Sequence, residues 1–124
     1  MPATKKGATI LALIKTVNLK HGMPLVREAL AQLEREINVA RQQGCQLLKI
    51  VHGYGSHGVG GDIRIAVQKE LSALCESGGC AGVIFGEDWR ISNELTWQLL
   101  QKHKSLKQDT DLGRSNRGIT IVVL

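Results

Sequence analysis

The stretch "LLKIVHGYGSHGVGGDIR", residues 47–64, decides the fold of this chain. An apolar run ends at His52, and the nine residues that follow, 53–61, contain five glycines before helix-forming residues resume. A short apolar run bounded by turn residues is typical of a buried strand. Glycines let the backbone turn sharply and approach a ligand closely. The stretch therefore predicts a buried strand, a glycine loop and then a helix.

The flanking sequence continues this alternation. Apolar and β-branched runs predict strands over residues 10–19 (most securely 17–19), 46–51, 80–85 and 119–124. Helical spacing of apolar residues predicts a helix that follows Pro24 and ends at Gly44, a second helix that contains Ile63 and Leu74 and stops before Gly78, and a third over residues 91–106. Residues 107–118 are polar and predict a loop. This order favours a single-domain, two-layer α/β sandwich with a mostly parallel four-stranded sheet.

Length and composition limit the alternatives. A chain of 124 residues with 43% hydrophobic content is the size of one domain. Lys15 and Lys20 interrupt the one long apolar segment, so no membrane span is expected, and we expect a cytoplasmic protein. The odd number of cysteines, Cys45, Cys75 and Cys80, has no CxxC spacing. This pattern argues against a disulfide framework and a zinc site, and predicts reduced thiols in or near the core.

Basic residues are concentrated towards the ends of the sequence. Residues 1–22 contain four basic and no acidic residues, residues 23–88 contain six basic and eight acidic, and residues 89–124 contain six basic and three acidic, which gives blocks of +4, −2 and +3 within the total of +5. If the terminal segments meet on one face, they favour a polyanionic partner. A modest net charge is also ordinary for a small soluble domain.

Two histidines follow predicted strand ends. If strands 17–19 and 47–51 are parallel neighbours, their carboxyl ends lie side by side, with His21 after one end and His52 after the other. Loop amide groups between them are suited to an anion, most often phosphate. Asp62 complicates this site, because an acid at a helix start caps the same amides and repels phosphate. The loop would then hold phosphate through its glycines, which are Gly53, Gly55, Gly58, Gly60 and Gly61.

Two well-known glycine motifs fit poorly. Gly53, Gly55 and Gly58 satisfy GxGxxG, but a dinucleotide-binding motif has an acidic residue about 20 positions further on, and here Glu87 and Asp88 lie too far along. A P-loop requires a lysine followed by serine or threonine, which the stretch lacks. We therefore expect no dinucleotide cofactor.

The stretch "KIVHGYGSHGVGGDIRIAVQKEL" resembles the core of the Smr (small MutS-related) domain. That family has a His-Gly-x-Gly loop followed by a helix that opens with Leu-Arg-x-x-Val, and the matching residues here are His52, Gly53 and Gly55, then Ile63, Arg64 and Val67. The segment "VNLKHGMPLVREALAQLERE" is similar to the family's Leu-Asp-x-His-Gly segment and its helix. The resemblance covers residues 16–86 and 117–124, and residues 89–116 look like an insertion within a single domain of residues 1–124.

The resemblance implies a fold similar to the carboxyl-terminal domain of translation initiation factor 3, and DNA or RNA as partner. It also implies endonuclease activity for members that carry the aspartate and histidine of the first motif. This chain has Asn18 at the aspartate position and one extra residue before His21, so nuclease activity is less expected than binding. If the chain cleaves, His52 with His21 as partner would move the proton while Arg64 stabilises the phosphate.

The candidate residues each have a plainer interpretation. His52 serves as acid or base, or is a structural histidine bonded to the loop backbone. Arg64 binds phosphate or pairs with a nearby carboxylate. The remaining basic candidates for a nucleic-acid-binding rim are also typical of solvated surface: Lys102, Lys104, Lys107, Arg114 and Arg117. With four aromatic residues in the chain, a stacking platform for bases has little material.

Two other functions compete with a nuclease. One is a non-catalytic module that docks nucleic acid or a ribonucleoprotein, which Asn18 favours. The other is a binder of small phosphate compounds or nucleotides. The sequence indicates no set of metal ligands, and a requirement for Mg²⁺ is expected only if the domain is catalytic.

Overall fold

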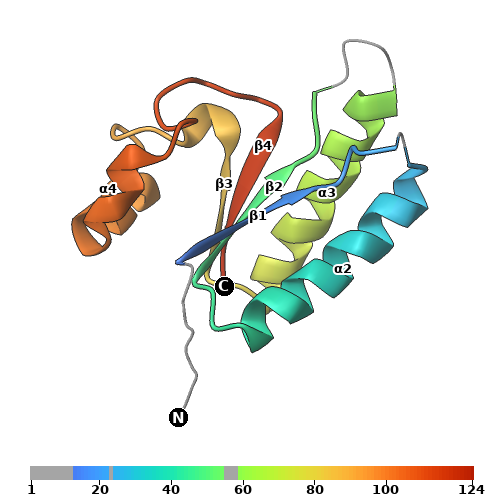
Figure 1. The fold of residues 1–124 in the computed structure, drawn as a ribbon, viewed down its shortest axis with the longest axis horizontal. Helices are drawn as coiled ribbons and strands as arrows, with labels where there is room; N and C mark the ends of the chain where they lie inside the picture. The colour runs from blue at the N-terminus through green and yellow to red at the C-terminus, as the bar shows by residue number, and fades with distance from the viewer. Residues whose placement is uncertain (1–12, 23, 55–58) are drawn as a thin grey trace.

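The computed structural model of this protein describes residues 13–22, 24–54 and 59–124. Its order of strands and helices is the predicted one (Figure 1). The third predicted helix is shorter than expected, because a separate 3-10 helix follows it after His103. The strands are β1 (Ile14–Asn18), β2 (Leu47–Val51), β3 (Gly82–Phe85) and β4 (Ile119–Val123), and the helices are α2 (Val26–Gln42), α3 (Val59–Glu76) and α4 (Glu94–Lys102), with 3-10 helices η1 (Gly86–Asp88) and η2 (Lys104–Gln108).

The sheet is mixed, which corrects the prediction of a mostly parallel sheet. The strand order is β1-β2-β4-β3. β1 pairs with β2 in parallel, as predicted, but β4 lies between β2 and β3 and is antiparallel to both. The amino end of β4 therefore lies at the edge of the sheet where β1, β2 and β3 have their carboxyl ends.

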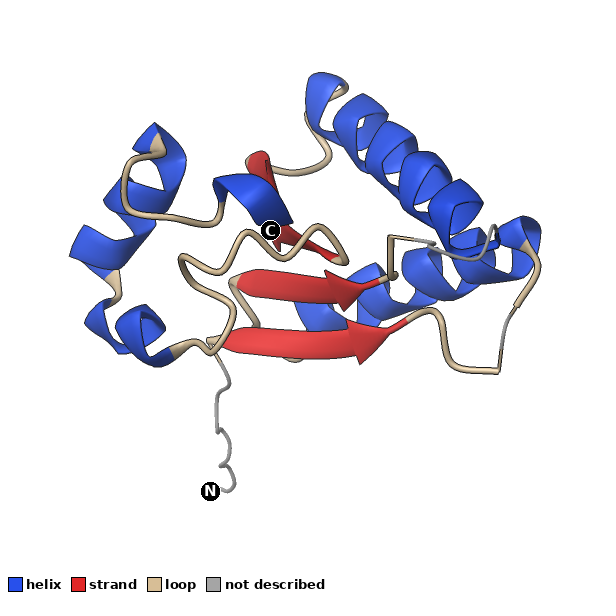
Figure 2. Ribbon diagram, turned by 90° about the horizontal axis from the view of Figure 1, so that it is seen from above, coloured by secondary structure: helices blue, strands red, loops and turns tan. Residues whose placement is uncertain are grey.

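Three layers form the domain, so the two-layer prediction is also wrong. Helices α2 and α3 cover one face, on which Leu48, Ile50 and Val122 are buried. Segment 86–118 covers the other face, and Trp89 and Leu100 are buried there. Figure 2 shows α2 and α3 on one side of the sheet and the α4 segment on the other. The second cover is needed because β2 and β4 have apolar side chains on both faces, and each of these faces must be buried.

Local signals place the two long helices. Glu28 accepts a hydrogen bond from the backbone N–H of Leu25 (2.8 Å) at the start of α2, and Gly44, with φ of 77°, follows its end. Helix α3 starts at Val59, earlier than the glycine content suggests. Gly60 and Gly61 are therefore helical residues and not part of a loop. Gly55 and Gly58, together with His57, lie outside the described residues.

The cysteine prediction is wrong for two of the three thiols. Cys75 and Cys80 form a disulfide across the turn that follows α3, with Cα atoms 4.5 Å apart. Gly78 has a positive φ of 87° and reverses the chain, which brings the two cysteines together despite a sequence separation of 5. Cys45 is free and buried, as predicted. No helix in the described ranges is long and apolar enough to cross a membrane.

Candidate functional site

Three segments meet at the edge of the sheet where β2 ends. Val51 of β2 lies beside Ile119 of β4, and Phe85 of β3 lies beside Thr120. The backbone N–H of Leu19, just after β1, donates to the carbonyl of Val51 (2.8 Å). The predicted alignment of the β1 and β2 ends is therefore confirmed. Because β4 is antiparallel, the loop that precedes it reaches the same edge as the His-Gly motif.

His52 is fully buried beneath this edge. Its Nδ1 lies 2.6 Å from the carbonyl oxygen of Gly53, and its Nε2 lies 2.9 Å from Oγ1 of Thr120. A carbonyl can only accept, so Nδ1 carries the proton and Nε2 accepts from the Thr120 hydroxyl. Gln68 of α3 in turn donates to Thr120 Oγ1 (3.4 Å). Both ring nitrogens are thus engaged within the chain.

Burial lowers the pKa of His52 below its ordinary value, because the charged ring is poorly solvated there. The Gly53 carbonyl opposes this effect, and the positive charge of Arg64 adds to it, while Glu87 acts in the opposite direction. Nε of Arg64 and Oε1 of Glu87 are buried and have no hydrogen-bond partner within the described part of the chain. His52 therefore lies close enough to two side chains of opposite charge for both to act on its pKa.

Gly118 joins the His-Gly motif to the loop before β4. Its carbonyl accepts hydrogen bonds from the backbone N–H groups of His52 (2.9 Å) and Gly53 (3.0 Å). A Cβ at Gly118 would lie 3.1 Å from Oδ1 of Asn116 and 3.4 Å from both Cα of Gly53 and Cδ1 of Tyr54. Glycine is therefore the residue that lets these two backbones approach so closely.

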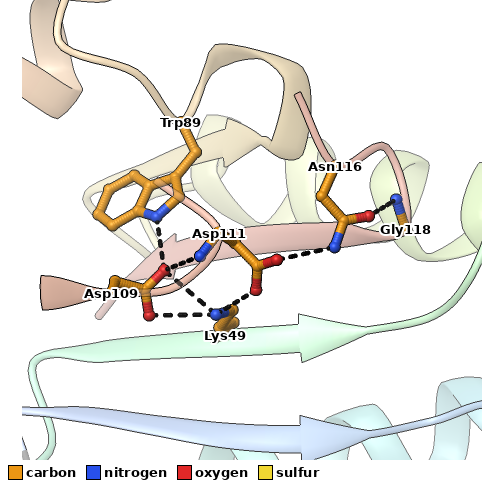
Figure 3. Close-up of polar contacts among 6 residues, drawn as sticks. All are labelled: Lys49, Trp89, Asp109, Asp111, Asn116 and Gly118. Atoms are coloured by element: carbon orange, nitrogen blue, oxygen red, sulfur yellow. Dashed lines mark hydrogen bonds and ion pairs between the residues drawn. The ribbon is translucent and has the colours of Figure 1, made fainter. Parts of the chain in front are cut away.

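A buried lysine anchors the same loop from below (Figure 3). Lys49 lies in the middle of β2 and is 5% exposed. Its Nζ contacts both oxygens of Asp109 (3.1 and 3.2 Å) and bonds to Asp111. Trp89 Nε1 also donates to Asp109 (2.9 Å), and Asn116 Nδ2 donates to Asp111 (2.9 Å). The network thus connects the centre of the sheet to the loop.

The pKa values of Lys49 and Asp111 are shifted because the two side chains pair with each other. Burial acts to lower the pKa of Lys49, but the hydrogen bonds that it donates to Asp111 and Asp109 outweigh this effect, and the net pKa is raised. For Asp111, burial acts to raise the pKa, but the bonds to Lys49 and Asn116 prevail and lower it. Asn116 Oδ1 accepts from the N–H of Gly118 (2.9 Å). The charge cluster therefore positions, through one amide side chain, the glycine that holds the His-Gly motif.

An open hollow of about 670 Å³ lies above this network. Its lining combines Tyr54, which follows the His-Gly motif, with residues of the loop before β4, and the full set is Tyr54, Thr110, Asp111, Arg114, Ser115, Asn116 and Arg117. Arg114 and Arg117 are exposed, and neither forms an ion pair with any other described residue. The one acidic residue of the lining is Asp111, whose carboxylate already bonds to Lys49 and Asn116. The hollow therefore presents positive charge.

The structure brings some predicted residues together and separates others. His52, Gly53, Arg114 and Arg117 share this edge, and Arg64 lies close enough to His52 to affect its pKa. His21 lies on the exposed turn after β1, unlike the buried His52. In that turn Asn18 Oδ1 accepts from the N–H of Lys20 (2.9 Å). Three lysines of the predicted rim, Lys102, Lys104 and Lys107, are exposed. They lie in the layer on the opposite side of the sheet from α3 and Arg64.

Among the residues of this site that sequence reasoning missed are Lys49, Tyr54, Thr120 and Gly118. A signal existed for two of them. Lys49 is the one charged residue in the apolar run 47–51, and Thr120 is the one polar residue in 119–123. A polar group inside a buried strand requires a bonding partner, which marks such positions as parts of a network. The described residues contain no group of three or more His, Cys, Asp or Glu side chains placed to hold a metal ion.

Comparison with known proteins agrees with this geometry. The family model of the Smr domain matches residues 21–124, which is most of the chain. The chain therefore belongs to the Smr domain family, whose members generally bind nucleic acid and include endonuclease-like proteins. Searches of curated proteins and of solved structures found no match.

Proposed function

We propose that this Smr domain binds DNA or RNA at the edge of the sheet where β2 ends and β4 begins. The observation that carries the proposal is the hollow beside the His-Gly motif. Arg114 and Arg117 project from its loop without ion-pair partners among the described residues. Unpaired guanidinium groups are suited to phosphate oxygens, and phosphate and sugar together receive at least half of the hydrogen bonds in protein–DNA complexes.

Arg64 and the lysines extend this positive surface in the proposal. Arg64 adds charge beneath the motif from α3. The three lysines of the α4 layer, Lys102, Lys104 and Lys107, would contact phosphates further along the strand. Such contacts are independent of sequence and weaken steeply as salt rises.

The test is a salt titration of affinity by fluorescence anisotropy. The variant Arg114→Gln/Arg117→Gln is compared with Arg35→Gln/Lys69→Gln, which removes the same charge from exposed positions on α2 and α3. We expect the first variant to bind more weakly and to lower the slope of log affinity against log salt by roughly 1.5, while the control keeps the wild-type slope. Equal behaviour of the two variants would remove the hollow from the binding surface. Binding of mononucleotides with no affinity for polymers would support the small-phosphate alternative.

Endonuclease activity is a second candidate function, because the family includes endonuclease-like members. In that case His52 would act as the base with His21 as partner. The buried position of His52, with both ring nitrogens bonded within the chain, favours the binding function, since a general base needs a free nitrogen within reach of substrate. Incubation with supercoiled plasmid and structured RNA, with Mg²⁺ and with a chelator, tests this candidate. Cleavage that is lost in His21→Ala, whose side chain is exposed, would establish it.

A further inference from the structure

We infer that the hollow beside the His-Gly motif holds one unpaired base, stacked on the ring of Tyr54. This inference rests on the proposed nucleic-acid binding and names the form of nucleic acid that the site takes, which is a single strand or a locally unpaired region. Three observations support it: the position of the Tyr54 ring, the two arginines that line the same hollow, and the hydrogen bonds that join the loop to the His-Gly motif.

Tyr54 is 59% exposed although it follows a buried motif directly. Its Cδ1 lies 3.4 Å from where a Cβ of Gly118 would stand, so the edge of the ring rests near the loop backbone. The ring also borders the hollow. An exposed tyrosine held at the wall of a concave, positive surface is the arrangement in which aromatic side chains stack on bases.

The charge and size of the hollow suit a nucleotide. Arg114 and Arg117 line the same hollow as the ring, so phosphates next to a stacked base would have guanidinium groups within the same site. The volume of about 670 Å³ falls within the range of small-ligand sites. Asp111 is the one acidic residue of the lining, and its carboxylate bonds to Lys49 and Asn116, so the two arginines outnumber it.

An unpaired base is required because a duplex covers the faces of its bases. In a double helix each face stacks on the next base pair, and only base edges reach the grooves. A tyrosine ring therefore stacks only on a base that has left the helix. The side chain of Asn116 is committed to Asp111 and Gly118, which leaves the hydroxyls of Thr110 and Ser115 to contact the base edge. With few such contacts, the site should tolerate all four bases.

The two walls of the hollow are joined in the free protein. Gly118 accepts from the N–H groups of His52 and Gly53 on the motif side, and Asn116 holds Gly118 on the loop side. The backbone segments that carry the ring and the arginines are therefore already joined before a ligand arrives, which lowers the entropic cost of binding.

The experiment measures the affinity of the full chain for a labelled single-stranded oligonucleotide and for a fully paired duplex of equal length, made from two strands and without a loop. Tyr54→Ala should weaken single-strand binding by about tenfold and leave duplex binding unchanged, because stacking is lost only in the first case. Tyr54→Phe keeps the ring and should bind like the wild type. Trp97→Ala is the matched control, since Trp97 is 47% exposed but lies on α4, and it should also bind like the wild type.

A strand with 2-aminopurine at one position gives a direct readout of stacking. Its fluorescence should be quenched by the wild type and by Tyr54→Phe, and not by Tyr54→Ala. If the wild type binds polymers but Tyr54→Ala matches it on single strands, the inference is wrong and the proposed function stands. The same holds if Trp97→Ala weakens binding as much as Tyr54→Ala. If the wild type binds no nucleic acid, both are wrong.

Discussion

Replacing Lys49 with methionine should destabilise the domain by about 3 kcal/mol. The lysine side chain is 7% exposed, and its partners Asp109 and Asp111 are 14% and 23% exposed. Removing one partner of a buried ion pair typically costs about 3–5 kcal/mol, because the remaining charge is buried without compensation. Here the value falls at the lower end, since Trp89 and Asn116 still donate to the carboxylates and water reaches them in part.

Urea unfolding measures this cost, with tryptophan fluorescence as the signal because Trp89 is fully buried. In thermal unfolding of a chain of this length, the same loss of stability corresponds to a fall in Tm of about 10 °C. The triple variant Lys49→Met/Asp109→Asn/Asp111→Asn is the decisive comparison. It leaves no buried charge, and both amides can still accept from Trp89 and Asn116, so it should recover at least half of the lost stability.

Two results would refute this reasoning. One is a cost below about 1 kcal/mol for Lys49→Met, which would mean that the cluster behaves like a surface ion pair. The other is a triple variant as unstable as the single one, which would mean that the lysine stabilises the sheet by packing of its alkyl chain and not by its charge.

Three further predictions concern other parts of the fold. Gly86→Ala should lower the free energy of unfolding in urea by more than about 2 kcal/mol, because its Cβ would lie 1.7 Å from the backbone oxygen of Asn116 and the loop would have to move. A loss within about 0.5 kcal/mol, as for an ordinary surface substitution, would contradict this contact. The free energy of unfolding should fall as the pH drops below about 6.5, since His52 binds a proton in the unfolded chain at a higher pH than in the folded chain. The slope should reach at most about 1.4 kcal/mol per pH unit, and the variant His52→Gln should not show it. Reduction of the Cys75–Cys80 disulfide should lower the free energy of unfolding by about 2 kcal/mol. Alkylation of the denatured, unreduced protein with mass spectrometry checks the bond, since three alkylated cysteines, in place of Cys45 alone, would exclude it.

Much of the local structure could be predicted from residue patterns. The helical spacing of apolar residues located α2 and most of α3, and the short apolar runs located all four strands. The parallel pairing of β1 and β2 also followed, because a helix between two strands favours a parallel crossover. The His-Gly motif was visible as a strand followed by glycines, and it indicated the family that the whole-chain comparison shows.

The sequence by itself determined the elements and the motif, whereas the tertiary structure decided the direction of β4 and everything that depends on it. A strand that is buried on both faces, such as β4, is mostly apolar, and that pattern is the same for either direction of pairing. Because β4 is antiparallel, Arg114 and Arg117 lie beside Tyr54 at the edge where β2 ends. Contacts between residues distant in the chain form the site, and local periodicity does not encode them.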